Sequence, residues 1–158
     1  HPDRRRIDRR CRPAHRRGLK VAYSAAPFVA DTVVPLLADV DLLSVNAIEL
    51  EQLLHAIGGA GNLPESLALL VTRGGEGADY IAGGSKTTVG AHAVSVVDTT
   101  GAGDVFLGAF LAETDKGADP ATAMATANAA AALQVGRHGA TEAIPTLADI
   151  RAFQARRG

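Results

Sequence analysis

Cysteine and tryptophan are nearly missing from this 158-residue sequence, which has one cysteine, Cys11, and no tryptophan. A single cysteine cannot form an internal disulfide, so the sequence lacks the cross-links of small secreted domains. It also lacks any run of about 18 purely apolar residues, the length that a membrane-spanning helix needs, and the pattern of a secretory signal. These absences favour a cytoplasmic protein with no membrane partner.

Two common kinds of site are missing as well. The histidines His55, His92 and His138 do not have the spacing of zinc ligands, so we expect each to be exposed or hydrogen-bonded locally. No Gly-x-x-x-x-Gly-Lys-Ser/Thr sequence occurs, which excludes the P-loop class of kinases. Any nucleotide or metal chemistry must therefore come from other motifs.

Positive charge is concentrated at the N-terminus. Residues 1–20 contain nine Lys/Arg and two acidic residues, a net charge of +7, whereas the rest of the chain has seven basic and fifteen acidic residues, a net charge of −8. This positively charged N-terminal segment, the basic head, could bind nucleic acid by neutralising the phosphates of the nucleic acid. It has no interleaved aromatic residues and no apolar period, which favours the other interpretation, a disordered or non-native leader over residues 1–18.

From Leu19 onward, apolar residues follow the periods of strands and helices in alternation. Continuous apolar runs predict buried strands, and apolar positions repeated every three or four residues predict helices. The expected strands are 19–23, 41–45, 67–72, 78–82, 86–89 and 92–97, and the expected helices are 31–38, 47–57, one that opens after 99–103, 120–135 and one that begins at 146. This alternation predicts an α/β fold in which a mostly parallel sheet has helices on both faces.

The segment 97–104 places a glycine-rich turn between an expected strand and an expected helix. Free backbone N–H groups at a helix N-terminus bind anions, and glycine lets a phosphate approach the backbone closely. A carboxylate beside such an anion site can act as a base toward a hydroxyl during phosphoryl transfer. Asp104 is therefore a candidate base, and the alternative is that it only caps the helix.

The same residues resemble a known signature. Asp-Thr-Thr-Gly-Ala-Gly-Asp, residues 98–104, followed by Val-Phe-Leu-Gly-Ala-Phe, is similar to the second signature of the PfkB/ribokinase family of sugar and nucleoside kinases. The resemblance implies a ribokinase-like three-layer sandwich and ATP-dependent phosphorylation of a sugar hydroxyl with Mg2+. It also implies that Asp104 is the catalytic base, and that the backbone of Gly101, Ala102 and Gly103 is the anion hole for the γ-phosphate.

Three further segments resemble the family in the same order along the chain. Asn46 and Glu49 look like an Asn-x-x-Glu motif, in which the glutamate holds magnesium through water; the alternative is a solvated helix start. Residues 72–77, which are Thr72, Arg73, Gly74, Gly75, Glu76 and Gly77, resemble a loop that lies along the nucleotide; the alternative is a simple tight turn. Asn128 occupies the position of a polar residue beside the adenine, or is a core residue satisfied locally.

The family often binds a monovalent cation, commonly potassium, beside the anion hole. By the resemblance, the ligands here come from Asp98, Thr100, Gln134, Arg137 and Gly139, mostly through main-chain oxygens. A serine that often contributes a further ligand is Ala143 in this chain. We therefore expect K+ as a possible cofactor beside ATP and Mg2+.

The resemblance covers residues 19–153, which corresponds to the later, nucleotide-binding half of the family, so the fold is expected to be truncated on its N-terminal side. The first signature, most sugar contacts and the small β lid are not recognisable. We expect residues 19–158 to be the nucleotide-binding catalytic domain of a parent that is a homodimer, and the fragment alone to be a weak or inactive kinase. Residues 23–27 resemble a ribokinase stretch, which favours ribose or a related pentose or hexose as substrate. A non-catalytic nucleotide-binding remnant is the alternative, and nucleic-acid binding through the basic head is favoured less.

Overall fold

The computed structural model describes residues 13–14 and 16–156. Cys11 and most of the predicted basic leader, residues 1–12 and 15, lie outside these residues. The described chain forms two compact units: the first contains the residues up to Val71 together with Ile81–Lys86, and the second contains Thr72–Tyr80 together with the residues from Thr87 onward. No helix among the described residues is long and apolar enough to cross a membrane.

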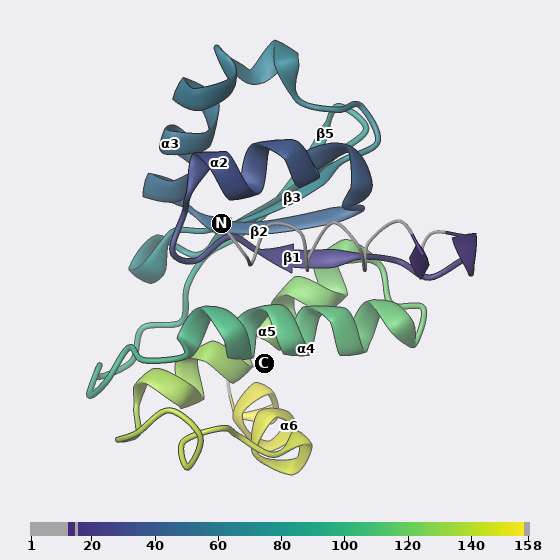
Figure 1. Cartoon of the computed structure of the whole chain (residues 1–158). Coiled ribbons are helices and arrows are strands. Elements are labelled where there is room, and N and C mark those ends of the chain that lie inside the picture. The colour runs from purple at the N-terminus through teal and green to yellow at the C-terminus, as the bar shows by residue number, and fades with distance from the viewer. Residues whose placement is uncertain (1–12, 15, 157–158) are drawn as a thin grey trace. The chain divides into compact units, whose positions relative to one another are not determined.

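Five strands form one sheet in sequence order: β1 (Ala22–Ser24), β2 (Leu42–Asn46), β3 (Ala68–Thr72), β4 (Ala78–Ala82) and β5 (Ser85–Val89) (Figure 1). β1 and β2 are parallel, with Ala22 opposite Leu42 and Ser24 opposite Ser44. Only the glycine pair Gly83–Gly84 separates β4 from β5, a connection that suits an antiparallel hairpin and not a parallel crossover. The sheet is therefore mixed, and five of the six predicted strands are confirmed with shifts of up to three residues at their ends.

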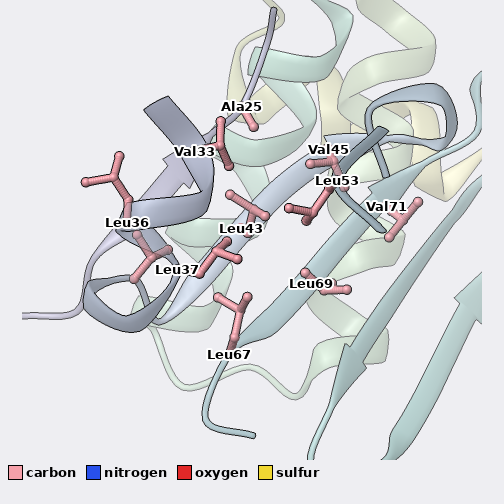
Figure 2. Close-up of a cluster of buried hydrophobic side chains, with 11 residues drawn as sticks. Ala25, Val33, Leu36, Leu37, Leu43, Val45, Leu53, Leu67, Leu69 and Val71 are labelled. Carbon is pink, nitrogen blue, oxygen red and sulfur yellow. The ribbon is translucent and has the colours of Figure 1, made fainter. Parts of the chain in front are cut away.

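The core of the first unit explains why β2 and β3 are continuous apolar runs. Four of the five residues of each strand are buried, and helices α2 (Ala30–Val33) and α3 (Ala47–Ile57) lie on one side of β1–β3 (Figure 1). Figure 2 shows Leu43 and Val45 of β2 meeting Leu69 of β3 and Leu53 of α3. Burial of these side chains supplies about 1.5–3 kcal/mol each relative to leaving them exposed.

Local chemistry sets the ends of the first-unit helices. α3 spans the predicted residues because Asn46 caps its start and Gly58, at φ +79°, ends it in the left-handed region. The helix predicted over 31–38 is only partly correct, since α2 ends at Val33 and a 3-10 helix follows over Val34–Asp39. Pro35 explains the change, because it lacks the backbone N–H that a continuing α-helix would use.

The second unit is built on an alanine-rich helix. α5 (Pro120–Val135) starts where Asp119 accepts hydrogen bonds from Thr122, and Pro120 fills its first position. Small buried side chains along α5 let it pack closely against α4 (Ala102–Asp115). Ile150 and Phe153 of α6 (Leu147–Ala155) complete a cluster with Ala129, Ala130 and Ala132 of α5.

The strand predicted over 92–97 is wrong. The segment is not part of the sheet, although its residues alternate in a strand-like way. The N–H groups of Val97 and Asp98 both donate to the carbonyl of Val135, at 2.7 and 3.2 Å, and Asn128 Nδ2 donates to the carbonyl of Gly90 at 2.6 Å. The C-terminal end of the segment is therefore bonded to the last residue of α5 and not to a neighbouring strand.

Candidate functional site

A cavity of about 400 Å³ lies within the second unit and joins segments that are far apart in the sequence. Its walls come from the loop after β3, the segment 91–96, the start of α4 and one face of α5. Seven of the residues predicted from the sequence line it: Thr72, Gly74, Gly75, Gly77, Ala102, Gly103 and Asn128. Three of the four resembling segments therefore meet at one cavity.

The loop after β3 is fixed by a buried ion pair and a close backbone contact. The Arg73 guanidinium donates to the carboxylate of Asp79, which is 4% exposed and also accepts from the Thr88 hydroxyl at 2.7 Å. The Arg73 N–H donates to the carbonyl of Gly77 at 2.8 Å. Arg73 and Glu76 do not line the cavity and lie within ion-pair range of each other, with Arg73 Nε 3.8 Å from Glu76 Oε2. Arg73 thus holds the loop in place, while glycine backbone faces the cavity.

The face of α5 toward the cavity is made of small side chains. Ala131, Ala132 and Val135 line it beside Asn128, which is 8% exposed. Asn128 is both locally satisfied, through its hydrogen bond to Gly90, and part of the cavity wall. Short apolar side chains leave room for a flat ring, and one amide among them can orient it.

The start of α4 provides the anion-binding geometry. Gly101, at φ +75°, is the N-cap, and Ala102 and Gly103 of the first turn line the cavity. The first N–H groups of a helix have no partner within it and carry the positive end of the helix dipole. Asp104 is exposed on the same turn, and it lines a second depression with α5 and α6 instead of the cavity. The first turn of α4 thus contributes both to the cavity and, through Asp104, to the second depression.

A second polar group lies beside this turn. Asp98 accepts hydrogen bonds from the N–H of Thr100 at 2.9 Å and from that of Gly139 at 3.3 Å. The hydrogen bond from the Thr100 hydroxyl, and then those from the two amides, hold the pKa of Asp98 below its ordinary value, so it is a carboxylate at neutral pH. Gln134 reaches the carbonyls of Thr100 and Gly139, and the N–H of Arg137 donates to the carbonyl of Gln134 at 3.1 Å. All five residues predicted for a cation site are thus brought together.

Asn46 and Glu49 form a capping box at the start of α3 in the first unit. Asn46 Oδ1 accepts from the Glu49 N–H, and Glu49 Oε2 accepts from the Asn46 N–H, each at 2.8 Å. The pair does start the helix, but Glu49 is buried, 9% exposed, and not solvated as expected. The magnesium role of Glu49 stays a prediction.

His92 is a cavity residue that the sequence did not single out as functional. It was expected to be exposed or locally satisfied; it is half-buried, lines the cavity, and packs edge-on against Phe153 with ring centroids 5.1 Å apart. Phe106 of α4 also lines the cavity. His92 has no motif around it, whereas Phe106 lies in the Val-Phe-Leu-Gly-Ala-Phe stretch that follows the signature and could have been singled out there. Among the described residues, no group of three His, Cys, Asp or Glu side chains could hold a metal ion.

Comparison with known proteins places this geometry in a family. The family model for pfkB family carbohydrate kinases matches residues 11–147. Ribokinase from Staphylococcus aureus (strain COL) is 32% identical over 124 residues, which cover 76% of this chain and 40% of that protein. Fructokinase-1 from Oryza sativa subsp. japonica is 27% identical over an alignment that covers 89% of this chain and 53% of that protein.

A solved structure of an E. coli protein described as ribokinase II, in complex with ATP and Mg2+, is also similar. Its TM-score is 0.83 at 29% identity, and the match covers 95% of this chain and 53% of that chain. The likeness confirms the predicted ribokinase-like α/β fold. The chain spans about half, or less, of the length of the relatives it matches.

Proposed function

The chain belongs to the pfkB family of carbohydrate kinases, and from this premise we propose that it is the nucleotide-binding, catalytic part of an ATP-dependent sugar kinase. The observation that carries the proposal is the cavity that unites the loop 72–77, Asn128 and the start of α4. Residues 19–158 are proposed to form this part; the family match itself begins at residue 11. The basic leader gives no comparable support for nucleic-acid binding.

ATP is proposed to lie with its base in the cavity and its phosphates toward α4. Ala131, Ala132 and Val135 provide a flat apolar surface for the base, with Asn128 at its edge. The loop 72–77 would run beside the nucleotide, since Gly74 and Gly75 present backbone to the cavity. The E. coli relative with bound ATP and Mg2+ supports ATP as the ligand.

The chemistry is proposed to take place at the first turn of α4. The backbone of Gly101–Gly103 would stabilise charge on the transferred γ-phosphoryl group, because its amides lie at the positive end of the helix. The Asp104 carboxylate would accept the proton of the sugar hydroxyl as the new O–P bond forms and the bond to ADP breaks. An exposed carboxylate beside these amides fits that role.

Magnesium would neutralise charge on the ATP phosphates when it is bound. Glu49 is proposed to hold it through water, and Asn46 to contribute beside it. Each side chain uses one oxygen in the capping box, so Glu49 Oε1 is the atom available for a metal-bound water. The family resemblance alone supports this part, since the pair lies in the first unit and the start of α4 lies in the second.

The substrate is proposed to be ribose or a related pentose or hexose. The relatives include a ribokinase and a fructokinase, both of which take their names from small sugars. The parent is proposed to be a cytoplasmic homodimer, by resemblance to the family. A non-catalytic nucleotide-binding protein is the second candidate, because the cavity could hold a nucleotide without any sugar site.

Nucleotide binding tests the proposal in a way that does not need a sugar. Replacing Ala131, which lines the cavity, by phenylalanine should fill the space for the base and weaken ATP binding at least about tenfold, or about 1.4 kcal/mol. Isothermal titration calorimetry with Mg-ATP measures the effect. Ala125 is exposed on the same helix and does not line the cavity, so Ala125→Phe is the matched control and should bind ATP like the unchanged chain.

Two outcomes separate the candidates. Equal ATP affinity of Ala131→Phe and the unchanged chain would place the nucleotide elsewhere and remove the proposed site. Normal ATP binding with no ADP release across a panel of ribose, fructose and related sugars would favour the non-catalytic nucleotide-binding protein.

A further inference from the structure

A buried side-chain amide lies at the centre of a group of carbonyl oxygens beside the first turn of α4. Gln134, near the end of α5, is 0% exposed. Its Nε2 donates to the carbonyls of Thr100, Gly139 and Ala140 at 3.1, 3.3 and 2.9 Å. Thr100 precedes the anion-binding turn, and the other two residues belong to the loop after α5, so one amide joins two segments about 40 residues apart in the sequence.

This group of oxygens is of the kind that a monovalent cation would take. Carbonyl oxygens that point at one place repel one another unless a cation or a hydrogen-bond donor lies among them. In this chain the donor is Nε2 of Gln134, whose two N–H groups point into the place where the oxygens converge. The residues present therefore do not fit a cation at that centre, although Asp98 and the carbonyls alone would.

Two neighbouring residues support this view. Ala143 is 1% exposed and offers no side-chain oxygen where the family often has a serine hydroxyl. Each carboxylate oxygen of Asp98, the anionic residue of the predicted cation site, accepts a hydrogen bond, one from the N–H of Thr100 and one from that of Gly139. The negative charge and the oxygens of the predicted site are thus met by hydrogen-bond donors of the chain itself.

The orientation of the amide follows from the same contacts. Among the described residues, Gln134 Oε1 is the one buried side-chain oxygen or nitrogen without a hydrogen-bond partner. A buried acceptor without a partner costs free energy, so the three hydrogen bonds of Nε2 must stabilise this orientation by more than that cost. The opposite orientation would turn Oε1 toward three carbonyl oxygens, which would then need a cation or another hydrogen-bond donor among them.

We propose that the side-chain amide of Gln134 replaces the monovalent cation, so that the chain orders its anion-binding turn without potassium. Gln134 is then a positioning residue, which acts through the carbonyl of Thr100 on the turn that begins at Gly101. The turn is close: a Cβ placed on Gly101 would lie 3.7 Å from Gln134 Nε2. The inference concerns the order of the chain and does not depend on the proposed kinase activity.

The test is thermal unfolding of the 158-residue chain, followed by circular dichroism, in potassium chloride and in choline chloride at the same ionic strength. Choline is too large to enter the space among the three carbonyl oxygens. The unchanged chain should have the same midpoint in both salts. Gln134→Glu puts a carboxylate among the carbonyls and Gln134→Ala leaves their centre open, so both variants should melt lower in choline chloride and regain stability specifically in potassium chloride.

A matched control distinguishes an effect at the carbonyl site from a general effect of the added negative charge. Gln52 is exposed on α3, so Gln52→Glu adds the same charge at a place without converging carbonyls and should show no potassium-specific shift. A potassium-specific rise in the midpoint of the unchanged chain would overturn the proposal. So would the absence of a potassium response in both Gln134 variants, or their failure to fold in either salt while Gln52→Glu folds, because potassium should restore what the amide supplied.

Discussion

Replacing Asp104 by asparagine should lower sugar-dependent ADP release about 10²- to 10⁴-fold, the usual contribution of a general base. The asparagine amide has nearly the same shape but cannot accept a proton from the attacking hydroxyl. ATP binding should change little, because Asp104 does not line the cavity proposed for the nucleotide. The expected result is a loss in kcat with an unchanged ATP affinity, measured by coupled ADP assay and calorimetry.

A second acidic residue of α4 provides the control for this prediction. Glu113 lines the same depression as Asp104, at the other end of the helix, and pairs with Lys116 at 2.7 Å. Glu113→Gln should keep full turnover, because its carboxylate is far from the amides of the first turn. Turnover of Asp104→Asn equal to that of the unchanged protein would eliminate Asp104 as the base.

Replacing Gly77 by alanine should destabilise the second unit by at least about 3 kcal/mol, the upper range for one strained backbone position. Gly77 has φ +106° and ψ −141°, a region that is open to glycine and hardly to any other residue. An added Cβ would also lie 1.9 Å from the carbonyl oxygen of Val89, which forces the backbone apart. Because Gly77 lines the cavity, ATP affinity should fall together with stability.

Gly75 in the same loop is the matched control. It lines the cavity, has no positive φ, and has no atom within 4 Å of an added Cβ. Gly75→Ala should therefore leave the midpoint of urea unfolding unchanged, or raise it slightly because alanine restricts the unfolded chain. Similar losses of stability in both variants would mean that the loop, and not the special backbone of Gly77, limits stability.

The sequence by itself determined the features that depend on neighbouring residues. The bounds of α3 and α5 match the predictions because Asn46, Gly58, Asp119 and Pro120 act within one turn of the helix ends. β2 and β3 were recognisable because strands buried on both faces are apolar throughout. The glycine-rich turn before α4 was predictable because Gly101 and the helix start at Ala102 are adjacent in the chain, although the strand expected before them does not form.

The tertiary structure alone decided the partners of polar groups that bond to residues outside their own helix or turn. The segment 92–97 has the pattern of a strand, but Val97 bonds to Val135, 38 residues away. Arg73 belongs to a nucleotide-loop motif, yet its guanidinium is used by the buried Asp79. Gln134 was expected to contribute a main-chain oxygen to a cation site. Instead, its side-chain Nε2 donates to the three carbonyl oxygens of Thr100, Gly139 and Ala140. Apolar periodicity records only whether a residue is buried, whereas a hydrogen bond also needs a partner in the right direction, and the folded chain supplies that partner from far along the sequence.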